Sequence, residues 1–129
     1  MKPTHLIIGG RHMGKRTYAE SLYGPPERVC DLGRCGVEEM NGADLIINLH
    51  LCVRHLLERG ANAMSFLTAN IELFKGHVLI GDEIGAGVVP VDPFERRWRD
   101  ETGELYQLLA AEADIVDRIW AGLPIRLKG

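Results

Sequence analysis

The sequence predicts an α/β fold, with helices flanking a mostly parallel sheet. Short apolar runs alternate with longer helix-forming stretches along the chain, which is typical of a sheet built from strand–helix–strand units. A glycine-rich loop follows the first apolar run and precedes a helix-forming segment, as in phosphate-binding strand–loop–helix units. The chain has 129 residues, of which 46% are hydrophobic and 26% charged, so we expect residues 1–129 to form a single nucleotide-binding domain with its own core.

The first half of the chain predicts three strands, at Leu6–Ile8, Arg28–Leu32 and Asp44–Asn48. A helix over Arg16–Tyr23 follows the first strand and ends at Gly24-Pro25-Pro26, because proline cannot continue a helix. Residues 33–43 contain three glycines and predict a loop.

The second half predicts three helices, at His50–Arg59, Asn62–Phe74 and Pro93–Ala113. Gly60 ends the first of them, and Asn62 can cap the second. Three further strands are expected, at His77–Ile80, Ile115–Trp120 and Ile125–Leu127, the last two separated by Gly122-Leu123-Pro124. Ligands of such sheets bind at the carboxyl ends of the strands, where the first strand delivers its loop.

The glycine loop is the strongest functional signal. Glycines lack a Cβ atom, so the backbone can turn its N–H groups around an anion. The lysine that follows can reach the outer phosphates, and the start of the next helix favours the same negative charge. We therefore expect a nucleotide to bind through Gly9, Gly10, Arg11, His12, Met13, Gly14, Lys15, Arg16 and Thr17.

One position departs from a standard loop of this kind. The Ser or Thr that normally follows the lysine, and whose hydroxyl holds Mg²⁺, is replaced by Arg16. The sequence therefore predicts nucleotide binding but makes an ordinary Mg²⁺ site doubtful, and no metal ligand is assigned.

A second chemical cluster follows the apolar run that starts at Val78. Asp82 and Glu83 come at its end, where a carboxylate can orient a metal or a substrate hydroxyl, or act as a base. We assign Lys15, Asp82 and Glu83 as the candidate catalytic residues. The competing interpretation of this segment is a solvated acidic turn.

From His77 to Lys128 the chain resembles the adenosylcobinamide kinase / adenosylcobinamide-phosphate guanylyltransferase family of cobalamin biosynthesis. The residues that carry the resemblance are Glu83-Ile84-Gly85-x-Gly87-Val88-Val89-Pro90, Arg96, Arg99-Asp100, Gly103, Leu109-Ala110, Ala113-Asp114, Gly122 and Arg126-Leu127-Lys128. Gly9-Gly10-x-x-x-Gly14-Lys15 and Ala19-Glu20 resemble the family's N-terminal loop and helix. The resemblance implies a P-loop (RecA-like) sheet whose last strand is antiparallel.

The chain looks like a shortened and divergent member of that family. The resemblance implies a segment with a histidine that becomes guanylylated, but residues 28–43 are short and contain no histidine. The family places an acidic residue after the next strand, where this chain has Asn48. His50, just beyond it, is either a replacement acceptor or an ordinary residue at a helix start.

Two functions follow from these observations. The first is an ATP- or GTP-dependent kinase of a corrinoid alcohol, without guanylyltransferase activity. The second is a catalytically impaired protein that binds a nucleotide or another anion for regulation or assembly. Arg96 and Arg99 are candidate contacts to the corrinoid or phosphate, with a solvated basic helix face as the alternative. The resemblance also implies a homo-oligomer.

Composition limits the remaining classes. A net charge of −3 disfavours a general nucleic-acid surface. The sequence has no leader pattern and no apolar run approaching ~18 residues, so we expect a cytoplasmic protein without a membrane span. The three cysteines predict reduced thiols; a zinc site is the alternative, made from Cys30, Cys35, His50, Cys52 and His55, whose spacing is not that of paired Cys-x-x-Cys ligands.

Overall fold

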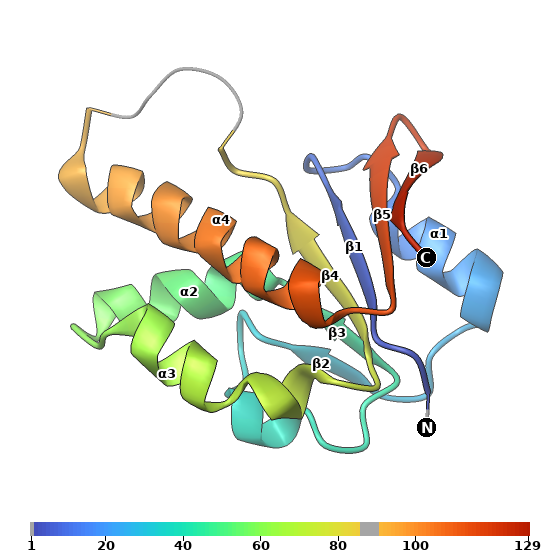
Figure 1. Cartoon of the computed structure of the whole chain (residues 1–129), viewed down its shortest axis with the longest axis horizontal. Coiled ribbons are helices and arrows are strands. Elements are labelled where there is room, and N and C mark those ends of the chain that lie inside the picture. Colours follow the sequence, from blue (N-terminus) through green and yellow to red (C-terminus); the bar gives the residue numbers. More distant parts are fainter. Residues whose placement is uncertain (1, 86–90) are drawn as a thin grey trace.

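The computed structural model describes residues 2–85 and 91–129 (Figure 1). In this part of the chain the strands form one six-stranded sheet in the order β2-β3-β4-β1-β5-β6. All neighbouring strands run parallel except the β5–β6 pair, which is antiparallel. The predicted fold class, including the antiparallel last strand, is confirmed.

The strands are β1 (His5–Gly9), β2 (Val29–Asp31), β3 (Leu45–Ile47), β4 (Val78–Asp82), β5 (Ile115–Trp120) and β6 (Leu123–Lys128). The helices are α1 (Lys15–Tyr23), α2 (Leu49–Glu58), α3 (Ala63–Ala69) and α4 (Pro93–Glu112), with short 3-10 helices η1 (Val37–Glu39) and η2 (Ile71–Phe74). Asp92 caps α4 by accepting a hydrogen bond from the Phe94 N–H, and Pro93 occupies the first turn, where its missing donor costs nothing.

Several predicted boundaries differ from the structure, and three differences are the most informative. The predicted loop 33–43 contains η1, and the helix expected to reach Phe74 ends at Ala69 and is followed by η2. The last strand begins at Leu123 rather than Ile125, because Ala121 and Gly122 alone make the hairpin turn. Both residues have positive φ angles, 49° and 78°, as a two-residue turn between twisted strands requires.

The two faces of the sheet are covered differently. Helix α1 packs on one face through Ala19, which joins a small cluster with Ile7, Leu45, Ile80 and Ile119. Helices α2, α3 and α4 cover the other face (Figure 1) and enclose the larger cluster. Successive strand residues point to opposite faces, so Leu6 and Leu79 belong to the larger cluster while their neighbours Ile7 and Ile80 belong to the smaller.

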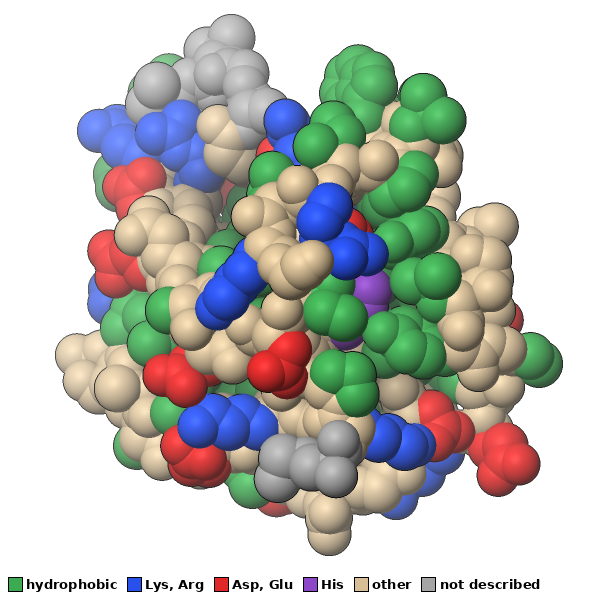
Figure 2. All heavy atoms as spheres, turned by 45° about the vertical axis from the view of Figure 1, so that its right-hand side comes forward, with side chains coloured by type: hydrophobic (Ala, Val, Ile, Leu, Met, Phe, Trp, Pro, Cys, Tyr) green, Lys and Arg blue, Asp and Glu red, His purple; other side chains and the backbone are tan. Residues whose placement is uncertain are grey.

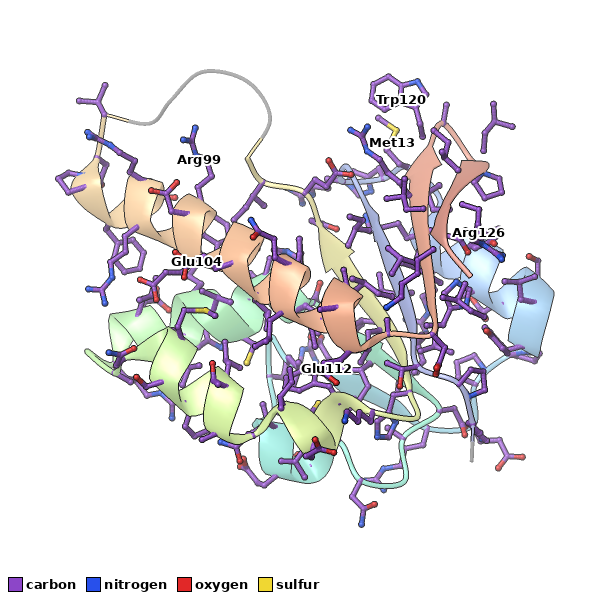
Figure 3. The ribbon with its side chains drawn as sticks, viewed as in Figure 1. Met13, Arg99, Glu104, Glu112, Trp120 and Arg126 are labelled. Atoms are coloured by element: carbon purple, nitrogen blue, oxygen red, sulfur yellow. The ribbon has the colours of Figure 1, made fainter. Side chains whose placement is uncertain are left out.

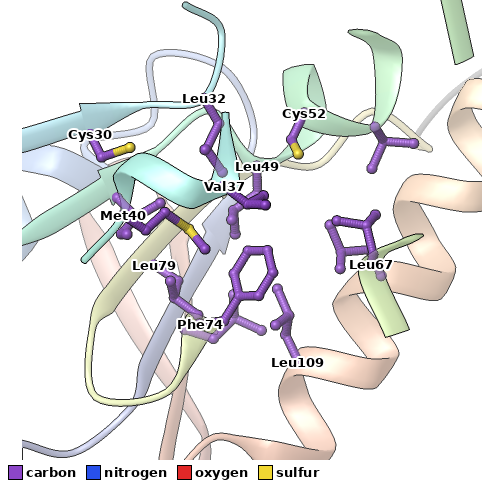
Figure 4. Packing of buried hydrophobic residues seen from close by; sticks show 14 of the residues in the cluster. Cys30, Leu32, Val37, Met40, Leu49, Cys52, Leu67, Phe74, Leu79 and Leu109 are labelled. Atoms are coloured by element: carbon purple, nitrogen blue, oxygen red, sulfur yellow. The ribbon is translucent and has the colours of Figure 1, made fainter. Parts of the chain in front are cut away.

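The larger cluster is the main core of the domain (Figure 4). Phe74 fills its centre and is 1% exposed, with Leu79 of β4, Leu67 of α3 and Leu109 of α4 around it. This core fixes α2 and α4 against the carboxyl ends of β3 and β4, where the candidate site lies. No helix of the described residues is long and apolar enough to cross a membrane.

A buried polar network ties α1 to the C-terminal hairpin. The Asp117 carboxylate of β5 is 1% exposed and accepts a hydrogen bond from the Tyr18 hydroxyl at 2.8 Å and from Arg126 Nε at 2.6 Å. His5 Nε2 lies 2.7 Å from the same carboxylate, and its Nδ1 lies 2.7 Å from the Tyr23 hydroxyl. The helix that follows the glycine loop is thus held to β1, β5 and β6 by polar side chains.

Candidate functional site: the glycine loop and the ends of β1, β3 and β4

The glycine loop leaves β1 at Gly9 and enters α1 at Lys15. Gly14 adopts a left-handed conformation with φ 94°, which a residue with a Cβ atom rarely adopts. A Cβ atom on Gly9 would lie 2.5 Å from the Ile119 carbonyl oxygen, so the neighbouring strand also requires glycine there. The backbone therefore explains why these two glycines are needed for the loop to form.

The turn of the β5–β6 hairpin supports this loop. The Gly122 N–H donates to the Met13 carbonyl at 2.8 Å, and the Ala121 N–H lies 3.3 Å from the Met13 sulfur. Met13 and Trp120 lie together at this end of the sheet (Figure 3). The loop is therefore supported by the β5–β6 turn, which is more than a hundred residues away in sequence.

Lys15 is the buried cation of the site. Its side chain is 7% exposed, and its ammonium donates to the Gly10 carbonyl at 2.7 Å. Asp82 Oδ1, at the end of β4, lies 2.8 Å from Lys15 Nζ. The structure therefore brings together the predicted lysine and one of the two predicted carboxylates, because β1 and β4 are parallel neighbours that end at the same edge.

His50 is a third member of this cluster. It lies in the first turn of α2, is 6% exposed, and its Nδ1 accepts the Asp82 backbone N–H at 3.1 Å. A neutral imidazole that accepts at Nδ1 carries its proton on Nε2, and Nε2 lies 3.5 Å from Asp82 Oδ2. Burial lowers the pKa of His50; the Asp82 charge opposes this shift and Lys15 adds to it. We expect a neutral His50 at pH 7.

The contact between His50 and Asp82 was missed in the sequence analysis. From the sequence, His50 is a candidate nucleotidyl acceptor, a helix-start residue or a ligand of the alternative zinc site, and none of these predicts a contact with Asp82. The signal was present: β3 and β4 are adjacent parallel strands, so polar residues just after each of them meet at one edge. Trp98 of α4 further fixes the backbone there, donating from Nε1 to the His50 carbonyl at 2.7 Å.

Asn48 occupies the turn between β3 and α2, in a left-handed conformation with φ 64°. Its amide donates to Asp31 Oδ1 at 2.7 Å, and the Gly33 N–H donates to the same oxygen at 2.8 Å. The predicted strand Asp44–Asn48 is therefore too long by one residue at each end, and its last residue is a helix cap. An amide at position 48 suits this site, because it faces a carboxylate.

Glu83 points away from Lys15. Its backbone N–H donates to the Gly9 carbonyl at 2.8 Å, and its carboxylate accepts from Arg118 Nε at 2.7 Å and Nη2 at 3.1 Å. The two predicted catalytic carboxylates are therefore separated: Asp82 faces the lysine of the loop, whereas Glu83 faces β5 and a pocket of about 410 Å³ beneath α4.

The other predicted site residues lie around this centre without joining it. Arg16 is half-exposed, and its Nε lies 3.7 Å from Glu20 on the surface of α1. Arg11, His12 and Thr17 are exposed on the loop and the first turn. On α4, Arg96 donates to the Val91 carbonyl at 3.1 Å, whereas Arg99 rises from the helix (Figure 3) and lines the pocket beside Glu83. Residues 86–90 of the acidic glycine-rich segment lie outside the described residues.

The zinc alternative finds no support from the geometry. Within residues 2–85 and 91–129, no group of three or more His, Cys, Asp or Glu side chains is placed to hold a metal ion. Burial raises the pKa of the Cys52 thiol to about 11, which keeps it protonated at neutral pH. His50 is turned toward Asp82 instead of the cysteines.

The chain matches the cobinamide kinase / cobinamide phosphate guanyltransferase family over residues 40–127. This region contains β3, α2, β4, α4 and β5, and the glycine loop precedes it.

Two curated proteins are similar to the chain. One is the bifunctional adenosylcobalamin biosynthesis protein CobP of Pseudomonas aeruginosa, 44% identical over 52 residues, which are 40% of this chain and 30% of that protein. The other is the bifunctional adenosylcobalamin biosynthesis protein CobU of Salmonella typhimurium, 39% identical over 51 residues, which are 40% of this chain and 28% of that protein. The alignments thus span less than a third of each relative.

Proposed function

Since this chain belongs to the cobinamide kinase / cobinamide phosphate guanyltransferase family, we propose that it binds ATP or GTP on residues 9–17 and phosphorylates a corrinoid alcohol. One observation carries the proposal. A buried ammonium, Lys15 Nζ, stands at the end of a glycine loop beside the Asp82 carboxylate, where phosphates and the attacking hydroxyl would meet.

The roles of the side chains follow from this arrangement. Lys15 moves from Asp82 to the outer phosphates of the nucleotide and neutralises the charge that develops there. Asp82, released from the ammonium, orients the acceptor hydroxyl, whose oxygen bonds to the γ-phosphorus as the bond to the bridging oxygen breaks. The proton of that hydroxyl passes to the Asp82 carboxylate. His50 holds the Asp82 backbone and carboxylate in place throughout.

The donor groups near the loop do not form a good Mg²⁺ site. Mg²⁺ requires hard oxygen ligands in octahedral geometry. Arg16 stands where a hydroxyl would be, the Asn48 amide is engaged with Asp31, and the Asp82 carboxylate is held by Lys15. We therefore propose that the bound nucleotide is neutralised chiefly by side-chain cations and that its affinity depends little on Mg²⁺.

The same proposal excludes the guanylyltransferase half of the family's reactions. His50 is a poor acceptor of a nucleotidyl group, because Nδ1 accepts a backbone N–H and the ring is buried. Incubation with GTP labelled at the α-phosphate, followed by denaturation, should leave the protein unlabelled. Acid-labile label on His50 or His55 would show instead that the chain forms a nucleotidyl-enzyme.

The second candidate function is a nucleotide- or anion-binding protein without turnover. The observation that favours it is Arg16, a fixed charge on the first turn of α1 where a metal-binding hydroxyl is expected. Such a protein would bind nucleotide on the same loop and Lys15, so binding alone does not separate the two functions. Phosphoryl transfer to adenosylcobinamide separates them.

Calorimetric titration with ATP and with GTP, each in Mg²⁺ and in chelator, tests the proposal. We expect binding that Lys15→Ala weakens by about 1.5–3 kcal/mol, the range for hydrogen bonds to charged groups. The control is Lys2→Ala, whose side chain is 80% exposed and lies at the opposite end of β1. Equal binding by the wild-type protein and Lys15→Ala would contradict the loop assignment.

We also propose that the protein forms a homo-oligomer. Figure 2 shows hydrophobic side chains gathered on the face that carries the β5–β6 hairpin. Trp120, Leu123, Ile125 and Leu127 are each between 49% and 67% exposed there, and such patches are typical of contacts between proteins. Sedimentation analysis of the wild-type protein and of Leu123→Ser tests this directly.

A further inference from the structure

A pocket of about 410 Å³ lies between the end of β4 and α4. Ile8, Glu83, Arg99, Thr102, Tyr106 and Arg118 are among the residues that line it. It lies directly beside the candidate phosphate site, because Ile8 precedes Gly9 and the Glu83 N–H donates to the Gly9 carbonyl.

Thr102 is the unusual residue of this pocket. It is 1% exposed, and its hydroxyl oxygen has no hydrogen-bond partner among the residues that the structure describes. A threonine inside a helix ordinarily bonds to a carbonyl of the preceding turn, and a buried hydroxyl without a partner destabilises a protein. The hydroxyl is therefore left without a partner among these residues at a cost to the stability of the fold, in a residue that lines the pocket.

The charges around the pocket indicate what kind of group fits. Glu83 and Arg118 form a two-point ion pair, and Arg99, which is 24% exposed, adds a second guanidinium nearby. A bound carboxylate would lie against Glu83, and a bound ammonium against two arginines. A neutral group with both a donor and an acceptor avoids both repulsions and can bond to Thr102, which donates and accepts.

Tyr106 makes the pocket more selective. Its hydroxyl donates to the Asp82 carbonyl at 2.6 Å, and burial, together with the charges of Asp82 and Glu83, raises its pKa well above the ordinary value. Its hydroxyl therefore remains neutral and is already engaged with the Asp82 carbonyl, and its ring and Ile8 are apolar parts of the lining. Gly81 allows this approach, since a Cβ atom there would collide with the tyrosine hydroxyl.

We propose that this pocket binds a primary carboxamide arm of the phosphoryl acceptor, with the Thr102 hydroxyl as its specific hydrogen-bond partner and Glu83 and Arg99 at its edges. The inference rests on the proposed function only for the identity of the acceptor, a corrinoid that carries several such amides. The volume of the pocket lies within the usual range for ligand pockets. Glu83 is then a residue of the acceptor side, and Asp82 of the phosphate side.

The test uses Thr102→Val, which keeps the shape of the side chain and removes the hydroxyl. We expect a melting temperature about 3 °C higher, because an unpaired buried hydroxyl is gone, and about tenfold weaker binding of cobinamide, followed by the change in corrin absorbance. Thr102→Ser keeps the hydroxyl and should retain most of the affinity. Thr68→Val, at an exposed position of α3, is the matched control and should change neither quantity.

Three results would overturn the inference. A lower melting temperature in Thr102→Val would show that the hydroxyl already has a structural partner. Unchanged cobinamide affinity in that variant would place the amide elsewhere. Equal affinity of the wild-type protein for cobinamide and for the same ring with carboxylate arms would exclude amide recognition. Failure of the proposed function is distinguishable, because it appears as absent ATP and GTP binding or transfer, whatever the corrinoid titration shows.

Discussion

Asp82 holds both partners of the candidate site at once: its Oδ1 lies 2.8 Å from Lys15 Nζ, and its Oδ2 lies 3.5 Å from His50 Nε2. In the proposed function the carboxylate therefore competes with the nucleotide for the lysine. A phosphate group must displace Asp82 before Lys15 can bind it. This exchange makes the expected affinity for nucleotide lower than it would be with an unpaired lysine.

The Asp82→Asn substitution should separate these effects. The lysine loses its competitor and the polyphosphate a nearby negative charge, so we expect ATP to bind roughly tenfold more tightly, which corresponds to about 1.4 kcal/mol. Without nucleotide the protein should be less stable by about 1–3 kcal/mol, because the buried ammonium loses its counter-charge. Calorimetry and urea unfolding measure the two quantities, and Glu104→Gln on the surface of α4 is the control. Weaker ATP binding in Asp82→Asn would show that the carboxylate assists binding.

His50 should make the protein sensitive to mild acid. Burial depresses its pKa in the folded state below the ordinary value of about 6.5, so the unfolded chain takes up a proton first. Stability is complete above pH 6.5 and falls as the pH decreases from there toward the folded-state pKa, by up to about 1.4 kcal/mol per pH unit.

His50→Asn removes this proton while its side-chain oxygen can still accept the Asp82 N–H. Urea unfolding between pH 7.5 and 5 should show a flatter pH dependence in this variant than in the wild-type protein. His12→Asn replaces an exposed histidine and should leave the slope unchanged. Identical slopes for His50→Asn and the wild-type protein would mean that His50 titrates alike in both states.

Replacing Asn48 with the acidic residue that the family resemblance implies should lower the stability of the protein. An aspartate there would bring its carboxylate against Asp31 Oδ1, which now accepts the Asn48 amide at 2.7 Å. We expect Asn48→Asp to destabilise the protein by about 1–3 kcal/mol.

The double variant Asn48→Asp with Asp31→Asn exchanges the two groups and should recover most of the loss. Unfolding of the two single variants and the double variant forms a thermodynamic cycle that measures the interaction. Additive losses would show that the contact is not important for stability. An attempt to restore Mg²⁺ dependence should therefore combine Arg16→Ser with this exchanged pair.

The buried carboxylate of Asp117 should make the stability of the fold sensitive to strong acid. Burial alone would raise its pKa, but hydrogen bonds from Arg126, Tyr18 and His5 outweigh burial and hold the pKa below its usual value. Its contribution is complete above the unfolded pKa of about 3.9 and is lost as the pH falls through the folded-state value. Asp117→Asn should cost about 3 kcal/mol at pH 7, and the difference from the wild-type protein should narrow below pH 4. Asp100→Asn, at an exposed position, is the control for unfolding measured at both pH values.

Much of the fold could be predicted because its signals are local. Apolar runs such as Leu45–Ile47 and a proline at the start of α4 identify the elements without knowledge of their partners. The predicted element boundaries were wrong where tertiary contacts determine the end of a strand or helix. Asn48 was assigned to a strand because the apolar run continues to it, but its bond to Asp31 and its left-handed backbone make it the cap of α2.

The site was only partly predictable for a related reason. Lys15 and Asp82 could be placed together, since each ends a segment that leads to the same edge of a parallel sheet. The direction of Glu83 could not be predicted by spacing alone, because it depends on Arg118 of β5, and the strand order that makes β5 a neighbour of β1 is a property of the whole sheet. No sequence signal shows that the Thr102 hydroxyl lacks a partner among the described residues, since only packing determines whether a helical threonine finds one.

The hydrogen bond from Gly122 to Met13 has a consequence for the order in which the protein is made. During synthesis the glycine loop leaves the ribosome more than a hundred residues before the hairpin turn that supports it. Strand β1 also has no pairing strand until its two neighbours, β4 and β5, have been made. A growing chain therefore carries its glycine loop without this support until the hairpin turn has been made, and we infer that the proposed nucleotide site forms only after that point.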